Sequence, residues 1–282
     1  MKYLDLFELG KKIEIMDIGA AAINEIPIYT NLISNKIGNL NAFEGDERQI
    51  EKLKLKYKES IKLFTEFLFD GSEQDLYLAA PESGMTSLFK PNEKVLNFFN
   101  HFNHIGKISE IKKIQTSKLN DIEKLPLIDF AKLDIQGSEL TVLKNGNLKL
   151  KKCLAIQVEV SYVCLYENQP TFGEIDLWMR ENGYIPHRFM DIKRWSIAPT
   201  LFNNNPRVPG NQLLESDIIY IKDPFKAEFL DEEQLKKLIL LSHYCFQSYD
   251  LSVFFILELE KRNILEKDTF KNYITNIKKF SQ

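Results

Sequence analysis

The sequence predicts an α/β fold with a mostly parallel sheet, followed by an all-helical tail. Over residues 1–225, short apolar runs that suit buried strands alternate with segments of helix length. Several of these runs end in an acidic residue, and the first two such runs lie within residues 12–46. Residues 226–282 show only helical periodicity. We therefore expect a sheet domain at residues 1–225 and a helical extension at residues 226–282.

The stretch from Lys12 to Asp46 predicts a strand–helix–strand unit with a carboxylate at the tip of each strand. The first apolar run ends at Asp17 and Gly19, and the second ends at Glu44. Ligands of open α/β sheets bind beyond the C-terminal ends of the strands. Gly19 would let the backbone approach a ligand, and Glu44 can accept hydrogen bonds from two ribose hydroxyls. The pattern favours a nucleotide-like ligand, and the alternative is that both acids only cap the following helices.

The dinucleotide-binding fingerprint is incomplete in this unit. Ile23 stands where a third glycine would admit a pyrophosphate. This residue counts against NAD and is neutral for a cofactor without a pyrophosphate, such as S-adenosylmethionine.

The later elements follow from periodicity and from capping residues. The expected strands are residues 61–69, 75–80, 108–116, 127–134, 153–160, 185–190 and 217–221. The expected helices are residues 1–12, 24–35, 47–57, 119–125, 139–144, 172–182, 231–244, 251–261 and 268–280, with one more beginning at Pro91. Asp46 with Gln49, and Thr171 with Glu174, have the spacing of capping boxes.

The composition is that of a globular protein of the cytoplasm. Hydrophobic residues make up 44% and charged residues 27% of the chain. The net charge of −3 predicts no nucleic-acid partner. We expect no membrane span and no signal peptide, because acids interrupt the N-terminal apolar residues. Cys153, Cys164 and Cys245 lack metal-ligand spacing and are expected to be reduced thiols.

Acids fall at or near the ends of successive expected strands. They are Asp17, Glu44, Asp70, Asp134 and Glu159. A parallel sheet would gather them along one rim, which suits a cofactor with a ribose, an adenine amino group and a positive charge. S-adenosylmethionine has all three, and aromatic faces could add to the attraction for its sulfonium.

Two segments carry a more specific pattern. Residues 133–140 read LDIQGSEL, and residues 159–166 read EVSYVCLY, followed by QPTF at 169–172 and Asp176. They resemble the K-(I/L)-D-(V/I)-Q-G-x-E-L and E-V-x-F-x-x-L-Y…Q-P-x-F…D segments of the FkbM family of S-adenosylmethionine-dependent methyltransferases. The resemblance extends over about residues 13–261. It implies a Rossmann-like, mostly parallel sheet of about seven strands with helices on both faces.

The resemblance also implies cofactor contacts. Asp17, Gly19 and Ala20 would face the methionine part of S-adenosylmethionine. Glu44, with Asp46 nearby, would face the ribose. Residues from Leu68 to Asp70 would lie by the adenine, and Asp134 would lie beside the transferring methyl group. The chain departs from the family's D-x-G-A-N-x-G at Ala21–Ile23, which predicts an altered affinity for the cofactor.

Methyl transfer to a hydroxyl needs positioning and a base. His187 is the first candidate base, because its ordinary pKa suits proton transfer near neutral pH, and the alternative is a packed strand histidine. Asp134 is the second candidate, with Glu159 beside it. These two acids could also bind a divalent metal, but two acids alone do not make a metal site, so no metal is predicted.

Residues that would bind the acceptor are expected in three places. The loop at residues 81–88 contributes Thr86 and Ser87, the segment after residue 190 contributes Lys193, Arg194 and Trp195, and the segment before the last strand contributes Asn211 and Gln212. Surface charges, an anchoring tryptophan and a capped loop are the plainer interpretations.

The predicted function is S-adenosylmethionine-dependent O-methylation of a hydroxyl on a sugar, a glycan or a sugar-derived small molecule. The rival interpretation is a non-catalytic Rossmann-like binding protein that has lost its affinity for the cofactor, as Ile23 suggests. The helical extension is expected to cover the acceptor site or to form a homodimer interface.

Overall fold

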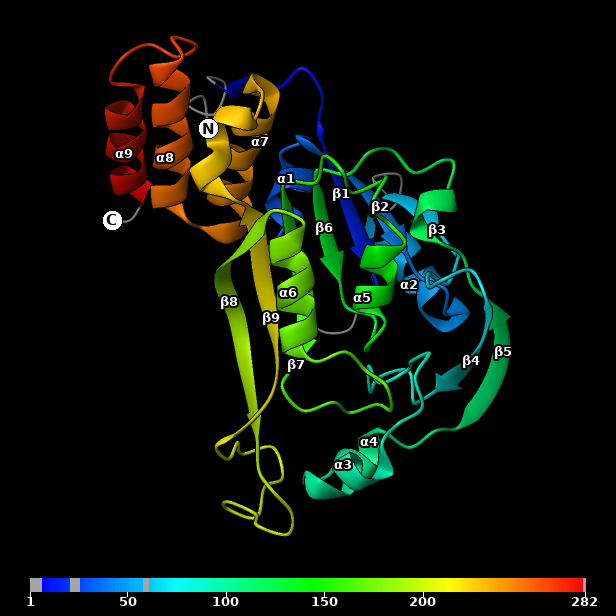
Figure 1. Cartoon of the computed structure of the whole chain (residues 1–282). Helices are drawn as coiled ribbons and strands as arrows, with labels where there is room; N and C mark the ends of the chain where they lie inside the picture. Colours follow the sequence, from blue (N-terminus) through cyan, green and yellow to red (C-terminus); the bar gives the residue numbers. More distant parts are fainter. Residues whose placement is uncertain (1–6, 21–25, 58–60, 281–282) are drawn as a thin grey trace. The chain divides into compact units, whose positions relative to one another are not determined.

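A computed structural model describes residues 7–20, 26–57 and 61–280 of the chain (Figure 1). The chain divides into two compact units. One unit consists of residues 16–24 and 40–222, and the other consists of residues 1–15, 25–39 and 223–282. The sequence predicts one boundary near residue 225. The second unit also contains two segments from the N-terminal part of the chain.

The main sheet has seven strands in the order β3-β2-β1-β6-β7-β9-β8. Their bounds are β1 Ile13–Ile18, β2 Gly38–Phe43, β3 Ile61–Phe64, β6 Phe130–Leu133, β7 Ala155–Ser161, β8 Tyr184–Trp195 and β9 Gln212–Lys222. β2 pairs with β3, and β6 with β7, in parallel, whereas β9 runs antiparallel to both of its neighbours. The predicted mostly parallel Rossmann-like sheet is therefore confirmed.

The central strands are buried on both faces. Every residue of β6 and of β7 is buried, which explains why both are mostly apolar. The polar residues in them are buried as well: Lys132, Gln157, Glu159 and Ser161.

The helices of the sheet unit are short. They are α2 Glu47–Tyr57, α3 Glu93–Phe98, α4 Phe102–Ile105, the 3₁₀ turn Leu119–Asp121, α5 Glu139–Lys144 and α6 Phe172–Glu181. α6 begins at a capping box, in which Glu174 accepts a hydrogen bond of 2.8 Å from the backbone N–H of Thr171. α2 begins without the predicted box, because the side chain of Gln49 donates to the carbonyl of Pro81 instead.

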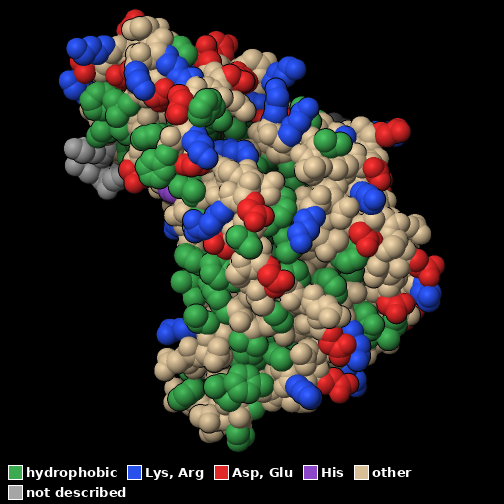
Figure 2. All heavy atoms as spheres, in the orientation of Figure 1, with side chains coloured by type: hydrophobic (Ala, Val, Ile, Leu, Met, Phe, Trp, Pro, Cys, Tyr) green, Lys and Arg blue, Asp and Glu red, His purple; other side chains and the backbone are tan. Residues whose placement is uncertain are grey.

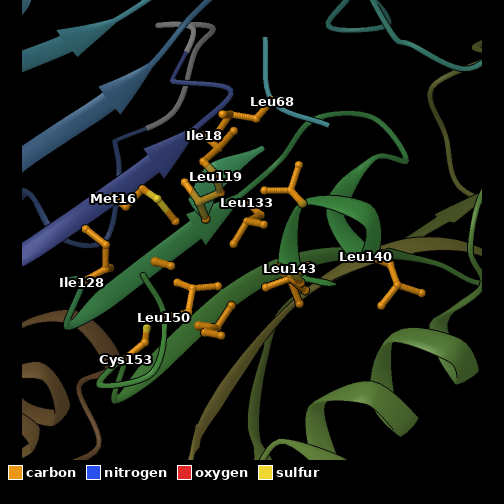
Figure 3. Packing of buried hydrophobic residues seen from close by; sticks show 14 of the residues in the cluster. Met16, Ile18, Leu68, Leu119, Ile128, Leu133, Leu140, Leu143, Leu150 and Cys153 are labelled. Atoms are coloured by element: carbon orange, nitrogen blue, oxygen red, sulfur yellow. The ribbon is translucent and has the colours of Figure 1, made fainter. Parts of the chain in front are cut away.

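The principal core lies between the strands and the helices that pack on them (Figure 3). Met16 and Ile18 of β1, Leu133 of β6, and Leu140 and Leu143 of α5 all belong to it. Burying each such side chain contributes roughly 1.5–3 kcal/mol. This core holds β1 and β6 side by side, so their C-terminal ends are fixed relative to each other.

A second, smaller core lies beyond the C-terminal end of β7 and at the N-terminal end of β9. Phe99 and Phe102 pack there with Tyr166 and Leu214, and Trp195 lies against them. A two-stranded sheet, β4 Glu73–Leu78 with β5 Glu110–Gln115, belongs to the same part of the chain, between β3 and β6. This region is therefore built from the segment between β3 and β6 together with the far end of the β8–β9 hairpin.

β8 is an edge strand and exposes apolar side chains. Phe189 is 42% exposed and Ile192 is 48% exposed, and Ile197, Phe202 and Leu213 at the end of the hairpin are similar. Figure 2 shows hydrophobic side chains gathered over this hairpin.

The predicted C-terminal helices are present, and they belong to the second unit together with α1. Its elements are α1 Thr30–Ser34, the 3₁₀ segment Pro224–Phe229, α7 Glu232–Leu241, a π-helical turn at Ser242–Phe246, α8 Tyr249–Lys261 and α9 Thr269–Phe280. The carboxylate of Glu233 in α7 accepts hydrogen bonds of 3.1 Å from the backbone N–H groups of Gly10 and Lys11. These bonds attach the N-terminal segment to the tail helices.

Two predicted helices at the N-terminal side differ from the structure. The helix expected over residues 1–12 is wrong for residues 8–12, which form no helix, while residues 1–6 lie outside the described residues. The helix expected over residues 24–35 is reduced to α1, and Asn24 lies outside the described residues.

None of the helices in the described residues is both long and apolar enough to cross a membrane.

Candidate active site at the C-terminal edge of the sheet

The tip of β1 is fitted closely against the tip of β6. The backbone of Gly19 has a φ of +79°, and an added Cβ would lie 1.9 Å from the carbonyl oxygen of Asp134. The backbone N–H groups of Gly19 and Ala20 donate to the carbonyl of Phe43 at 3.2 Å, and that of Asp134 donates to Ile18 at 3.1 Å. Only glycine fits this position, because a side chain would push the two strand ends apart.

The tip of β2 presents a buried carboxylate. Glu44 is 8% exposed, and its Oε1 accepts a hydrogen bond of 2.8 Å from the backbone N–H of Asp46. Burial raises the pKa of Glu44 to about 7, and the nearby charges of Asp46 and Asp17 add to the effect. Glu44 is therefore a carboxyl group that changes its charge near neutral pH.

Asp46 is held by an arginine that the sequence analysis did not single out. The guanidinium of Arg48 contacts Asp46 at 2.6 Å and also donates to the carbonyl of Ala79 at 3.3 Å. Although burial opposes it, the hydrogen bond from Arg48 keeps the pKa of Asp46 below its ordinary value. Arg48 thus joins the end of β2 to the loop that follows β4.

A buried lysine stands between two of the predicted acids. Nζ of Lys132 on β6 lies 3.8 Å from Oδ1 of Asp17 and 3.5 Å from Oδ2 of Asp134. Burial alone would lower the pKa of Lys132, but the charges of Asp17 and Asp134 raise it well above its ordinary value. The ammonium group therefore remains charged and compensates the acids at the centre of the edge.

Glu159 and Asp134 are brought together by Gln136. Nε2 of Gln136 donates to Oδ1 of Asp134 at 3.1 Å and to Oε2 of Glu159 at 2.9 Å. Nζ of Lys193 lies 3.5 Å from Oε1 of Glu159 and 2.7 Å from Oε1 of Glu215. Burial raises the pKa of Glu159 well above its ordinary value, and Glu215 and Asp134 add to the effect.

The turn that carries Gln136 is anchored by Glu139. The carboxylate of Glu139, itself buried, accepts hydrogen bonds from the backbone N–H groups of Ile135 at 2.8 Å and Gly137 at 3.2 Å. Ser138 precedes α5, and its hydroxyl makes no side-chain cap. Glu139 therefore fixes the turn that leads into α5.

Two predicted acceptor residues lie next to this turn or to Arg48. The hydroxyl of Ser87 donates to the carbonyl of Gln136 at 2.7 Å and accepts from the backbone N–H of Phe89 at 2.9 Å. Thr86 Oγ1 accepts from the backbone N–H of Ala79 at 3.2 Å and lies 3.5 Å from the guanidinium of Arg48. Both hydroxyls position the loop at residues 81–88.

Leu68 and Asp70 follow β3, which ends at Phe64 rather than at the predicted residue 69. Leu68 is buried and forms a parallel bridge with Ser117. Asp70 is exposed, and its carboxylate accepts hydrogen bonds from the backbone and the hydroxyl of Ser72. Asp70 therefore stabilises a turn, and among these contacts nothing links it to the other four acids.

The structure does not bring His187 together with Asp134 and Glu159. His187 lies in β8 between Pro186, which pairs with Tyr220, and Arg188, which pairs with Ile219. Glu159 of β7 pairs with Asp217 of β9, and Asp217 pairs on its other side with Asp191 of β8. Four residues of strand separate His187 from that level, a length of roughly 13 Å. A proton-transfer role for His187 at the edge stays a prediction without support from this placement.

Trp195 and its neighbours lie farther out along the hairpin. The indole N–H of Trp195 donates to the carbonyl of Asn100 at 2.7 Å, and its ring meets the edge of Phe102 at a centroid distance of 4.9 Å. Arg194 pairs with Leu213, and Gln212 pairs with Trp195, next to Asn211. These contacts pack the hairpin end, and none of them tests binding of an acceptor.

Among the described residues, no group of three or more His, Cys, Asp or Glu side chains is placed to hold a metal ion. Asp134 and Glu159 converge instead on the amide of Gln136, with lysines on their other oxygens.

Several residues of this site were missed at first, although the sequence contains a signal for one of them. A lysine within the apolar run Phe130–Leu133 has to be buried with a charged partner, so Lys132 could have been inferred. Tyr166 lies in the quoted segment at residues 159–166, but its contact with Gln136 does not follow from that pattern. Arg48 and Glu215 stand in ordinary amphipathic or mixed contexts, and only the fold brings them to the edge.

The family of the protein follows from a comparison over the region that builds this edge. The family model of the methyltransferase FkbM domain matches residues 17–186, more than half of the chain. The chain belongs to the FkbM methyltransferase family. The matched region contains Asp17, Glu44, Lys132, Asp134 and the Gln136 turn. No curated protein matches this FkbM-family sequence.

Solved structures with a similar course of the chain include other methyltransferases. A precorrin-6y C5,15-methyltransferase from Geobacter metallireducens GS-15 is 14% identical, with 79% of this chain and 86% of that chain covered and a TM-score of 0.37. Magnesium protoporphyrin IX methyltransferase from Synechocystis PCC 6803, solved with bound SAM, is 8% identical, with 76% and 71% covered and a TM-score of 0.37. A protein of the NADB-Rossmann superfamily from Streptococcus agalactiae is 12% identical, with 99% and 96% covered and a TM-score of 0.35. The low scores limit this likeness to the general fold.

Proposed function

We propose that this FkbM-family protein transfers a methyl group from S-adenosylmethionine to a hydroxyl of a sugar, a glycan or a sugar-derived small molecule. The observation that supports it most is that Asp17, Glu44 and Asp134 lie at the C-terminal ends of β1, β2 and β6, where Gly19 packs against the backbone of Asp134. A cofactor that is cationic and carries ribose hydroxyls suits this edge of acids.

The residues of the edge fit S-adenosylmethionine. Gly19 and Ala20 with Asp17 would hold the methionine part, and Glu44 would accept hydrogen bonds from the ribose. Asp134 would lie beside the methyl group. When bound, the cofactor supplies an electrophilic methyl group on a positively charged sulfur. The protein itself contributes the orientation of the two reactants, which can supply roughly 7–11 kcal/mol of the reduction in barrier.

Glu159 and Asp134 are the residues best placed to accept the proton of the acceptor hydroxyl. The raised pKa of Glu159 makes its ionised form a stronger base than an ordinary carboxylate. The loop of Thr86 and Ser87 is linked to both acids through Gln136. Ser87 donates to the carbonyl of Gln136, and the side-chain amide of Gln136 donates to Asp134 and Glu159. This loop is therefore the proposed side of entry for the acceptor, with Lys193 next to Glu159 as a donor toward acceptor oxygens.

The cytoplasmic location, the homodimer and the acceptor roles of Arg194, Trp195, Asn211 and Gln212 stay predictions. The exposed apolar residues of the edge strand β8, such as Ile192, are compatible with a subunit contact.

Two measurements test the proposal. Calorimetry with S-adenosylmethionine is expected to give saturable binding, and no heat up to millimolar concentration would favour the rival, a non-catalytic binding protein. Mass spectrometry of metabolites and glycans from cells with and without the gene is expected to show one species heavier by a single methylene. A pair of identical spectra would contradict the proposed transfer.

The pKa of Glu44 predicts opposite pH trends for stability and for cofactor binding. Since its pKa rises from 4.5 to about 7 on folding, the folded state holds a proton in this interval that the unfolded chain has lost. The free energy of unfolding should therefore fall as pH rises from 4.5 to 7, by at most about 3 kcal/mol. Affinity for S-adenosylmethionine should rise over the upper part of this interval, because the ionised carboxylate is the better acceptor for ribose hydroxyls.

Urea unfolding and calorimetry between pH 5 and 8 check both trends. Glu44→Gln should flatten the affinity profile and reduce the slope of the stability profile, to which Glu139 also contributes because burial raises its pKa to about 7. Glu51→Gln, at an exposed position of α2, is the matched control and should leave both unchanged. A Glu44→Gln protein with the wild-type slopes would show that another group titrates.

A further inference from the structure

Gln136 is held in a backbone conformation that a glutamine rarely adopts. Its φ is +54°, in the left-handed region, and Gly137 follows with a φ of +108°. The turn is fixed on both sides, because Glu139 accepts from the N–H groups of the two neighbouring residues and Ser87 donates to the carbonyl of Gln136 at 2.7 Å. A residue with a side chain is therefore held in a strained backbone conformation at this turn, as is common at functional sites.

All the polar atoms of the Gln136 amide have partners. Nε2 has two hydrogens, and it donates to Asp134 at 3.1 Å and to Glu159 at 2.9 Å. Oε1 lies 3.0 Å from the hydroxyl of the buried Tyr166, which lies 3.3 Å from the carbonyl of Met85. A flipped amide would turn its oxygen toward two carboxylates, so the two acids select the orientation in which both receive a donor, and the hydroxyl of Tyr166 donates to the remaining amide oxygen.

The remaining oxygens of the two acids face lysines. Oδ2 of Asp134 lies 3.5 Å from Lys132, and Oε1 of Glu159 lies 3.5 Å from Lys193. The other charged groups around this set are Asp17 on β1, Glu139 on α5, and Glu215 and Asp217 on β9. Two carboxylates and two ammonium groups from β6, β7 and β8 are therefore arranged around one neutral amide.

We propose that Gln136 is a positioning residue, which orients the carboxyl groups of Asp134 and Glu159 toward the bound methyl donor and acceptor, with Tyr166 holding its amide oxygen. The proposal rests on the proposed function, because it assigns Asp134 to the side of the methyl donor. Without the shared donor, the two carboxyl groups would lose the contact that joins them and one would turn away.

The test compares S-adenosylmethionine with S-adenosylhomocysteine, which lacks the methyl group and the positive charge. The ratio of the two dissociation constants reports the negative charge that faces the sulfonium, whereas contacts with ribose and adenine cancel. In Gln136→Met, the preference for the cationic ligand should fall about tenfold at pH 7, the size of one lost hydrogen bond to a charged group.

Gln169→Met is the matched control. Gln169 lies in the same region and also has two side-chain hydrogen bonds, to the hydroxyl of Ser161 at 2.7 Å and from the backbone N–H of Tyr166 at 3.2 Å, and neither joins it to Asp134 or Glu159. Loss of packing alone would weaken both ligands equally in Gln169→Met and in Gln136→Met. An unchanged ratio in Gln136→Met, with or without weaker binding, would overturn the proposal.

Tyr166→Phe keeps the test decisive if Gln136→Met does not fold. Removing the hydroxyl frees the amide to rotate, so the ratio should fall in the same direction by a smaller factor. A wild-type ratio in Tyr166→Phe would overturn the proposal. A wild-type protein that binds neither ligand would refute the proposed function, which is a different outcome from binding with an unchanged ratio.

Discussion

Gly19→Ala is expected to lower the free energy of unfolding by about 2–5 kcal/mol, combining a left-handed backbone with overpacking. The added methyl group would lie 1.9 Å from the carbonyl oxygen of Asp134 and 2.9 Å from its carbon, both backbone atoms that no side-chain rotation can move. The ends of β1 and β6 must separate to admit it. Affinity for S-adenosylmethionine should therefore fall at least about tenfold, the size of one lost hydrogen bond to a charged group. Calorimetry and urea unfolding measure the two effects.

Gly84→Ala separates backbone strain from the clash. Gly84 has a φ of +71°, close to that of Gly19, but no heavy atom of the described residues lies within 4 Å of its added Cβ. This control should lose only about 1–2 kcal/mol, the cost of the left-handed conformation. If Gly19→Ala lost no more stability than Gly84→Ala and bound the cofactor normally, the close fit at the β1 tip would have no functional meaning.

The sheet could be predicted from the sequence where strands are buried on both faces, and less well elsewhere. Residues 153–160 are a continuous apolar run, and β7 covers Ala155–Ser161. The hairpin was predicted too short, at 185–190 and 217–221, because β8 and the outer part of β9 carry polar and exposed side chains such as Arg188 and Glu215. An edge strand needs no apolar run, since pairing on one side supplies its backbone hydrogen bonds.

The sequence predicts the acids of this edge and Lys193, but it does not predict Lys132, Arg48 or the contacts of the Gln136 amide. Acids at strand tips can be placed by topology alone, and Asp17, Glu44, Asp134 and Glu159 lie at tips of β1, β2, β6 and β7. Asp70 differs because the chain leaves the sheet after Phe64. The contact of Tyr166 with Gln136 joins residues far apart in sequence, and no periodicity encodes such a pair.

Lys132→Met is expected to destabilise the protein without cofactor by about 3–5 kcal/mol, the range for breaking a buried ion pair by removing one partner. Methionine has nearly the volume of lysine, so packing is kept and the loss is one of charge. Asp17 and Asp134 would then face each other without the ammonium that lies 3.8 Å and 3.5 Å from them. Urea unfolding at pH 7 measures the loss, which should shrink as the pH is lowered, because protonation removes the uncompensated charge.

The same variant should be stabilised more than the wild type by S-adenosylmethionine, because a cation that binds only the folded state replaces part of the missing charge. The increase in Tm at saturating cofactor should exceed that of the wild type, whereas neutral S-adenosylhomocysteine should give no excess. Lys113→Met removes an exposed partner of Glu73 and should change neither stability nor the response to either ligand. Equal responses of Lys132→Met to the charged and the neutral ligand would mean that the sulfonium does not lie near the acids that Lys132 compensates, and the proposed position of the methyl group would have to be abandoned.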